Sequence, residues 1–291
     1  MYRDLKLEEE LCVRGLDAKA AALAFGDLTA YLGRPIEAIA EEYWRYRATD
    51  DVAAQERVAR ATDDAPVIAY YQQTPHYLYE LSYWEATGDK QAWFRVVAQA
   101  CRRYGLRRTL DLGGGVGGLS VFLRMRGIQS DHLDIAGKTS EYARWRFARR
   151  GLGVQAFDAA TPAGWPRGPY DAVVAWDVLE HIFDLEGAVR QAAGVLRPRG
   201  WFISKSTFAD AGGQHLHIHL AKHAEYVDVA KLNRMVSQFG FQFRGQLKPG
   251  RVSRLLRACG VRHAVAGIRL VPRLKHGGNF LVHERVNGNG S

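Results

Sequence analysis

Four aspartates follow four successive apolar runs in the middle of the chain. They are Asp111, Asp134, Asp158 and Asp177. In a sheet of parallel strands the carboxyl ends lie along one edge, and open α/β folds bind their ligands there. An aspartate at the end of each run therefore predicts a ligand site lined by carboxylates. The ordered set of four is far harder to obtain by accident than any single acid.

The first of these aspartates leads into a glycine-rich turn. The run from Thr109 to Gly118 reads TLDLGGGVGG, so Gly113, Gly115 and Gly117 all fall in the turn. Glycine allows positive φ and close approach of a ligand to the backbone, and the N–H groups that open the following helix bind polar groups of nucleotide-like ligands. Since the run also satisfies G-x-G-x-x-G, the turn alone is compatible with a dinucleotide-binding fold.

The acid before the glycines distinguishes between these cofactors. The run resembles motif I of the class I (Rossmann-like) S-adenosylmethionine-dependent methyltransferase family, in which an acid stands where Asp111 stands here. A carboxylate in that place attracts the cationic amino-acid end of S-adenosyl-L-methionine and repels a pyrophosphate. The resemblance covers about residues 105–207, and residues 227–285 by pattern only, and it implies S-adenosyl-L-methionine as the cofactor.

The resemblance also implies roles for the later strand ends. Asp134 follows the first glycine of the turn by 21 residues, where the family's acid holds the ribose hydroxyls; a helix cap is its other interpretation. Phe157 and Asp158 are expected to contact the adenine. Trp176 and Asp177 are expected to line the methionine side of the pocket.

The elements that position these residues begin at about residue 107, where short apolar runs alternate with amphipathic helical patterns. Strands are predicted over RTLDLG, SDHLDIAG, GVQAFDA, YDAVVAWD and WFISKSTF, and FQFRGQLK and NFLVHERV are predicted as a closing pair. The family resemblance implies an α/β fold: a Rossmann-like, seven-stranded, mostly parallel sheet with helices on both faces and an antiparallel last strand.

The part of the chain before the sheet has helical periodicity. Nine of the thirteen tyrosines of the whole chain lie between Tyr2 and Tyr83, densely in AYYQQTPHYLYELSYW. Residues 1–95 are therefore predicted to form a helical cap or lid over the pocket, with core packing as the plainer role for the aromatic residues. Residues 96–291 are predicted to form the S-adenosylmethionine-binding domain.

Positive charge gathers near the end of the chain. The formal net charge is +9, and residues 229–283 contain no acid. A basic insertion at about residues 249–276 carries Arg251, Arg254 and Arg257 at helical spacing, which predicts a short amphipathic helix. Such a surface attracts an acceptor that bears phosphate or is tethered to an acidic carrier protein, although a solvated basic surface explains the charge equally well.

Methyl transfer needs a base only where the acceptor must lose a proton. The candidates are His181, His217 and Tyr71. The run DVLEH from Asp177 also resembles metal-assisted members of the family, so Asp177, Glu180, His181 and His217 are candidate ligands of a divalent metal ion. The alternative is that these acids favour a helix start and that the histidines only hydrogen-bond.

Together these features predict a methyltransferase acting on the oxygen, nitrogen or carbon of a small-molecule acceptor. The alternatives are other S-adenosylmethionine chemistry, such as cyclisation of its aminobutyrate arm, an RNA methyltransferase, or an NAD(P)-dependent oxidoreductase. Nucleic acid is not an expected partner, because no aromatic RNP-type signature is present.

The remaining sequence features concern the compartment. No stretch approaches 18 uninterrupted apolar residues, so no membrane span is expected. The cysteines Cys12, Cys101 and Cys259 are few and far apart, which favours a reducing, cytoplasmic location. The oligomeric state is left open, and a homo-oligomer is compatible with the sequence.

Overall fold

The computed structural model describes residues 26–48, 52–86, 90–208, 218–249, 268–271 and 280–286. A mixed sheet crosses this part of the chain in the order β3-β2-β1-β4-β5-β8-β6-β7. Its strands are β1 (Arg108–Leu112), β2 (Gln129–Asp134), β3 (Ala156–Asp158), β4 (Tyr170–Trp176), β5 (Leu196–Lys205), β6 (Phe241–Pro249), β7 (Ile268–Val271) and β8 (Phe280–Arg285). Strands β1 to β5 pair in parallel, and β8 runs antiparallel between β5 and β6. The predicted Rossmann-like α/β fold and its antiparallel last strand are confirmed.

The strand count differs from the prediction. Seven strands were expected, and the described part of the sheet has eight, because β7 pairs antiparallel with β6 at the sheet edge. This four-residue strand lies inside the predicted basic insertion and has an arginine among its apolar residues. An edge strand needs little apolar alternation, so its sequence gives a weak signal. The amphipathic helix predicted around Arg251, Arg254 and Arg257 lies outside the described residues.

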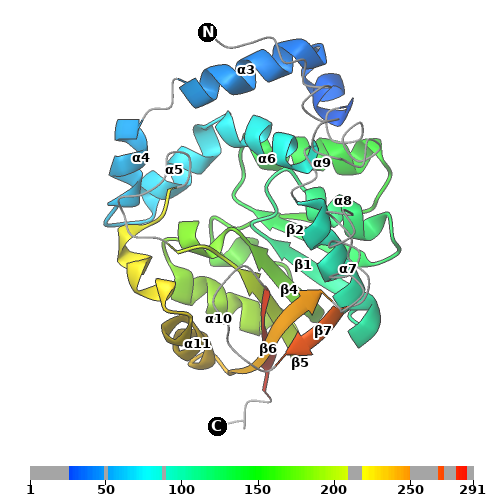
Figure 1. The fold of residues 1–291 in the computed structure, drawn as a ribbon, viewed down its shortest axis with the longest axis vertical. Coiled ribbons are helices and arrows are strands. Elements are labelled where there is room, and N and C mark those ends of the chain that lie inside the picture. Colours follow the sequence, from blue (N-terminus) through cyan, green and yellow to red (C-terminus); the bar gives the residue numbers. More distant parts are fainter. Residues whose placement is uncertain are drawn as a thin grey trace.

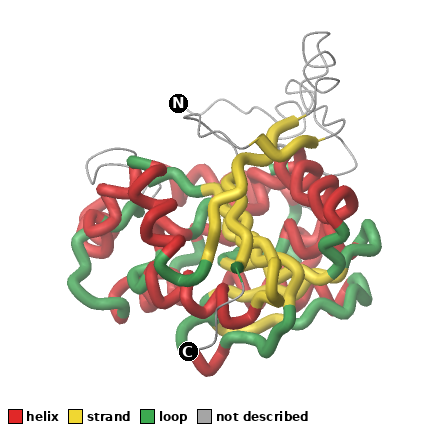
Figure 2. Tube along the Cα trace, turned by 90° about the horizontal axis from the view of Figure 1, so that it is seen from below, coloured by secondary structure: helices red, strands yellow, loops and turns green. Residues whose placement is uncertain are grey.

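Helices cover both faces of the sheet, as the view in Figure 2 shows. One face carries α7 (Gln91–Tyr104), α8 (Gly118–Arg124) and α9 (Lys138–Arg149), and the other carries α10 (Leu185–Val195) and α11 (Val229–Ser237). Strand residues alternate between the two cores: Ala172 and Val174 pack toward α7 and α8, while Val173 packs toward α10 and α11. This two-sided burial explains why the parallel strands are almost entirely apolar.

The helices before α7 form an arc over the sheet (Figure 1). They are a helix over residues 26–32, α3 (Ile36–Ala48), α4 (Val52–Ala59), α5 (Ala65–Gln73) and α6 (His76–Ala86). A separate core of tyrosines and aliphatic residues joins α3 and α6 to Tyr142 of α9. Helix α7 crosses the predicted domain boundary at residue 95 and packs on α8, so the division into a cap and a binding domain stays a prediction.

Three short 3₁₀ helices complete the described chain. They are η1 (Pro162–Gly164), η2 (Leu179–His181) and η3 (Ala221–Val227). Among the described helices, none has the length and apolar character needed to cross a membrane.

Candidate active site

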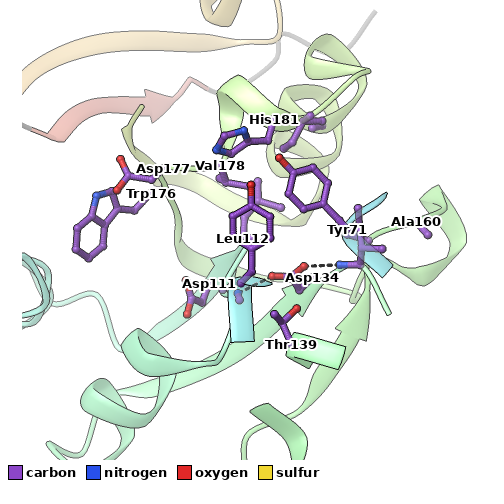
Figure 3. Close-up of a pocket in the computed structure, with 18 of the residues that line it drawn as sticks. Tyr71, Asp111, Leu112, Asp134, Thr139, Ala160, Trp176, Asp177, Val178 and His181 are labelled. Atoms are coloured by element: carbon purple, nitrogen blue, oxygen red, sulfur yellow. Dashed lines mark hydrogen bonds between the residues drawn. The ribbon is translucent and has the colours of Figure 1, made fainter. Parts of the chain in front are cut away.

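A cavity of about 370 Å³ lies where the carboxyl ends of β1, β2 and β4 meet the helices that precede the sheet. Figure 3 shows Trp176 and Asp177 at one end, Ala160 at the other, and Asp111 and Asp134 beneath. The strand order reverses at β1, because β2 and β3 lie on one side of it and β4 and β5 lie on the other. A crevice forms at such a point, which is the usual ligand site of open α/β sheets.

The glycine-rich turn after β1 forms the floor of the cavity. Gly113 and Gly115 both have positive φ, 68° and 54°, a conformation that favours glycine. There is also no room for side chains: a Cβ on Gly113 would lie 2.1 Å from Val178 Cγ2, and one on Gly115 would lie 2.5 Å from Leu81 Cδ1. The turn therefore presents bare backbone to the cavity, as predicted from the sequence.

Asp111 lies buried at the start of this turn and lines the cavity. Its Oδ2 accepts a hydrogen bond of 3.1 Å from the Ser120 hydroxyl. Burial raises the pKa of this carboxyl to about 7, although the Ser120 hydrogen bond and the Lys90 ammonium act in the opposite direction. A ligand cation beside Asp111 would favour the ionised form, so the site suits a positively charged group.

Asp134 ends β2 and holds the turn in place. Its Oδ2 accepts a 2.5 Å hydrogen bond from the Gly115 N–H, and its Oδ1 accepts a 2.7 Å bond from the Ile135 N–H. Burial and the nearby negative charge of Asp158 raise its pKa to about 6. Because each carboxylate oxygen has two lone pairs, Asp134 can still accept hydrogen bonds from two ligand hydroxyls.

Three residues expected at the cofactor do not line the cavity. Gly117 packs on α9, where an added Cβ would lie 2.6 Å from Phe147 Cζ. Phe157 packs against the core on the α10 and α11 side. The Oδ1 atom of Asp158 accepts hydrogen bonds from the Ala136 and Ala160 N–H groups, 3.1 and 3.0 Å long, so it connects the loops after β2 and β3.

The end of β4 forms one wall of the cavity. Trp176 packs edge-on against Phe94 of α7, and its buried indole N–H has no hydrogen-bond partner among the described residues. Asp177 has a φ of 49°, a left-handed conformation that aspartate tolerates better than most residues. Its carboxylate lies 3.7 Å from the ammonium nitrogen of Lys90 and 3.7 Å from that of Lys205. An unpaired buried donor beside charged groups fits a polar ligand.

His181 and Tyr71 meet on the other side of the cavity, 110 positions apart in the sequence. Their ring centroids are 5.9 Å apart (Figure 3). The Nδ1 atom of His181 donates to the Ile218 carbonyl at 2.6 Å, which makes Nε2 the basic nitrogen of the neutral ring. Burial lowers the pKa of His181, so the ring is neutral and able to accept a proton near pH 7.

Tyr71 is a poor base in this environment. Burial raises the pKa of its hydroxyl far above the ordinary value, and neighbouring Tyr70, Glu180 and Asp134 act in the same direction. The hydroxyl therefore remains protonated and is suited to donate a hydrogen bond. Tyr77 of α6 also lines the cavity, and burial raises its pKa in the same way.

The three candidate metal ligands that the structure describes, Asp177, Glu180 and His181, do not form a metal-binding group. Glu180 is buried away from the cavity, and its Oε1 accepts a 3.0 Å hydrogen bond from the Thr207 N–H. Asp177 faces two lysines instead. Within the described ranges, no group of three histidine, cysteine or acidic side chains could hold a metal ion. The fourth candidate, His217, lies outside the described residues.

The structure adds cavity residues that no sequence motif indicated. They come from α6, α7 and the residue before α7: Leu81, Trp84, Glu85, Lys90 and Phe94. No motif marks them, because they reach the cavity through tertiary packing of helices that precede the first strand. Only the density of aromatic residues pointed to this region.

A buried arginine connects these helices to the glycine-rich turn. Arg146 of α9 donates from Nη1 to the Val116 carbonyl at 2.7 Å. The same guanidinium pairs with Glu85 of α6 at 2.9 Å and with Asp27 at 3.1 Å. With only 3% of its side chain exposed, it holds the turn, α6 and the first described helix in one arrangement.

Comparison with known proteins agrees with this geometry. Residues 43–244 match a family model described as a methyltransferase domain. That range includes the glycine-rich turn, all four strand-end aspartates and the Tyr71–His181 pair. The glycine-rich turn alone is also compatible with a dinucleotide-binding fold, and the family match does not support that alternative.

The similar proteins include ubiquinone biosynthesis O-methyltransferases. The one from Chromobacterium violaceum is 29% identical over 157 residues, which cover 53% of this chain and 64% of that enzyme. The one from Bordetella pertussis is 34% identical over 97 residues, which cover 33% of this chain and 40% of that enzyme. The aligned part is thus less than two thirds of either relative.

Solved structures share the fold at low sequence identity. A putative O-methyltransferase from Nostoc punctiforme superposes with a TM-score of 0.55 and 14% identity, covering 92% of this chain and 72% of that one. The mitomycin 7-O-methyltransferase gives a TM-score of 0.51 and 14% identity, with coverages of 84% and 68%. At this identity the similarity concerns the fold alone.

Proposed function

The chain belongs to the methyltransferase-domain family, and we propose that it transfers a methyl group from S-adenosyl-L-methionine to a hydroxyl oxygen of a small molecule. One observation carries the proposal. The turn at Gly113 and Gly115, together with Asp134, faces the Tyr71–His181 pair across one cavity. A cofactor held by the strand ends and an acceptor held by the helices would therefore meet inside it.

The strand ends suit the proposed cofactor. Asp134 would accept the ribose hydroxyls, and Asp111 would face the ammonium group. Both carboxyls have raised pKa values, so a cationic, hydroxyl-bearing ligand would stabilise their ionised forms. The loops after β2 and β3 line the far end of the cavity through Ile135, Ala159 and Ala160, where a planar base would pack.

When bound, S-adenosyl-L-methionine supplies a methyl group made electrophilic by its sulfonium. The chain itself has to align the acceptor and exclude water. Apolar side chains from both halves of the molecule, among them Leu81, Phe94, Leu112 and Val178, line the cavity. Alignment of two reactants in such a pocket lowers a barrier by up to about 7–11 kcal/mol.

His181 is the proposed general base. Its Nδ1 is fixed on the Ile218 carbonyl, so Nε2 would take the proton of the acceptor hydroxyl. Tyr71, which remains protonated, would donate a hydrogen bond to the acceptor oxygen and orient it. These roles replace the alternative in which Tyr71 serves as the base.

The acceptor is proposed to be a small aromatic hydroxyl compound. Tyr71, Tyr77, Trp84 and Trp176 surround the cavity with rings that suit a flat apolar acceptor. The similar enzymes are named for O-methylation in ubiquinone biosynthesis, which supports an oxygen acceptor. Residues of α5 and α6 complete the cavity wall, which supports the proposed lid role of the helices before the sheet.

Two finer points remain part of the proposal. No metal ion is assigned, because the candidate ligands Asp177 and Glu180 are turned to other partners. The acid-free stretch over residues 229–283 supports an acceptor that carries phosphate or an acidic carrier protein, on the basis of its charge alone.

Calorimetric titration of the full chain tests the cofactor assignment. S-adenosylhomocysteine is expected to bind at one site per chain, and NADH is expected not to bind. The substitution Asp134→Ala should weaken S-adenosylhomocysteine about 10- to 150-fold, the usual loss when a charged hydrogen-bond partner is removed. If the folded wild-type protein binds NADH and does not bind S-adenosylhomocysteine, the proposal is refuted.

A further inference from the structure

Arginines gather at the end of the sheet where the parallel strands begin, opposite the cavity. They come from the last turns of α7 and α8 and from the turns that lead into β1, β2, β4 and β5. We call this group the arginine end, and its members are Arg102, Arg103, Arg107, Arg108, Arg124, Arg126, Arg167, Arg197 and Arg199. These turns contain no lysine.

Hydrogen bonds join the turns into one surface. The Gln129 N–H donates to the Arg107 carbonyl at 3.0 Å, which connects the starts of β2 and β1. Nη2 of Arg102 donates to the Arg126 carbonyl at 3.5 Å, which connects the end of α7 to the turn after α8. The Arg107 N–H also donates to Asp171 Oδ2 at 2.7 Å, which adds the start of β4. The arginine end is therefore continuous.

The acids at this end are too few to neutralise it. Asp131 lies 3.4 Å from Arg108 and 3.2 Å from Arg124, and Asp171 lies 2.5 Å from Arg197. Four exposed arginines have no ion pair within the part of the chain that the structure describes: Arg102, Arg103, Arg107 and Arg167. Their positive charge faces solvent.

Helix dipoles account for only part of this charge. Arg102 and Arg103 lie in the last turn of α7, where cations offset the negative end of the helix dipole. Arg107 and Arg167 lie outside the helices, so that explanation does not apply to them. Arginine forms paired hydrogen bonds with phosphate oxygens, which lysine cannot do. A surface with arginine alone therefore favours a partner that carries phosphate.

An apolar side chain lies within the arginine end. Met125, between Arg124 and Arg126 in the sequence, is 51% exposed. The ring of Tyr104 packs against Trp201 with centroids 4.6 Å apart, so it is not free to stack on a nucleic-acid base. Arginines around an exposed apolar side chain match the boundary between lipid headgroups and acyl chains. The surface thus favours a phospholipid bilayer over RNA.

We propose that the arginine end binds the surface of a membrane rich in anionic phospholipids. Strand β1 runs from Arg108 to Leu112, and the cavity lies beyond its far end, so a chain bound in this way keeps the cavity on the aqueous side. Each arginine close to an anionic membrane strengthens binding about fivefold. This inference is independent of the methyl-transfer proposal.

Sedimentation with lipid vesicles tests the membrane contact. The full chain is mixed with vesicles of equal parts phosphatidylglycerol and phosphatidylcholine, with vesicles of phosphatidylcholine alone, and with single-stranded RNA. The test variant combines Arg102→Gln, Arg103→Gln, Arg107→Gln and Arg167→Gln. The matched control removes four exposed arginines from other helices and turns: Arg57→Gln, Arg60→Gln, Arg144→Gln and Arg234→Gln. Thermal unfolding of each variant checks that it stays folded.

The wild type should bind the anionic vesicles, bind them less at high salt, and leave phosphatidylcholine vesicles unbound. The test variant should bind at least about 100-fold more weakly, and the control less than about 10-fold more weakly. Met125→Ser should weaken binding about fourfold or more, the loss for one buried methylene group.

Three results would overturn the proposal. The wild type might leave anionic vesicles unbound, or the folded test variant might bind them as the control does. Loss of vesicle binding on substitution of Arg251, Arg254 and Arg257 alone would assign the contact to the basic segment instead. Binding of RNA but not of vesicles, lost in the test variant, would assign the surface to nucleic acid.

Discussion

The most demanding prediction concerns Arg146, which is buried against two carboxylates and a turn carbonyl. The substitution Arg146→Met keeps much of the side-chain volume and removes every charged contact. Asp27 retains Arg150, whose Nη2 lies 2.5 Å from Asp27 Oδ2, but Glu85 is left buried without its cation. The Val116 carbonyl also loses its 2.7 Å hydrogen bond.

The expected loss of stability follows from these contacts. Removing one partner of a buried ion pair costs about 3–5 kcal/mol, because the other charge stays uncompensated. Since Asp27 keeps a partner, the lower end of about 3 kcal/mol is expected. For a chain of this size each kcal/mol lowers Tm by about 2–4 °C, so Arg146→Met should unfold about 6–12 °C below the wild type.

Calorimetric unfolding measures this difference in Tm, and two further variants serve as controls. Arg149→Met, on the exposed side of the same helix, should stay within about 0.5 kcal/mol of the wild type. The double variant Arg146→Met with Glu85→Gln should recover part of the loss, because the orphaned charge is gone. A double variant no more stable than Arg146→Met alone would show that the carboxylate of Glu85 is not the source of the loss.

Three further predictions test the site. Burial raises the pKa of Asp111 to about 7, so the ligand-free fold favours the protonated form and its stability should fall as pH rises from 4 through 7; Asp111→Asn should flatten that slope in urea unfolding, and an unchanged slope would contradict the assignment. Burial lowers the pKa of His181, so methyl transfer should persist below pH 6.5 and fall only at more acidic pH; His181→Gln should slow transfer from radiolabelled S-adenosyl-L-methionine about 100-fold or more and remove this acidic limb, whereas a retained limb would point to another base. Charge reversal at Arg251, Arg254 and Arg257 should raise KM for a phosphate-bearing acceptor and weaken the dependence of KM on salt; if neither changes, the basic segment is only a solvated surface.

The sequence predicted the parts of the fold that depend on local pattern. Strands β1 to β5 are short apolar runs separated by helical periodicity, and the carboxyl ends of β1 to β4 carry the expected aspartates. Asp111 and Asp134 reach the cavity because a strand end fixes where its last side chain can lie. Strand β7 was missed, since four residues in an arginine-rich stretch do not produce a recognisable alternation.

The remaining site residues depend on tertiary contacts. Asp158 lies at the end of its strand as expected, but its Oδ1 accepts hydrogen bonds from two backbone N–H groups. The spacing of residues in the sequence does not predict these hydrogen bonds. Lys90 lies in a segment without a motif and reaches the cavity only because α7 packs beside β4. Tyr71 is a candidate base by residue type, and burial raises the pKa of its hydroxyl, which favours the proposed role as a hydrogen-bond donor.

The placement of Arg146 also bears on how this scaffold can be re-engineered. Under the proposed function, acceptor preference is encoded in α5 and α6, ahead of every strand, while cofactor contacts are encoded at the strand ends. Acceptor range could then be altered by grafting one contiguous block from a relative, without editing the sheet. Such a graft replaces Glu85 but leaves Arg146 in the recipient. A chimera that omits the glutamate would leave the buried Arg146 with Asp27 as its remaining described carboxylate partner beside the glycine-rich turn, so the donor block should supply an acid at that position.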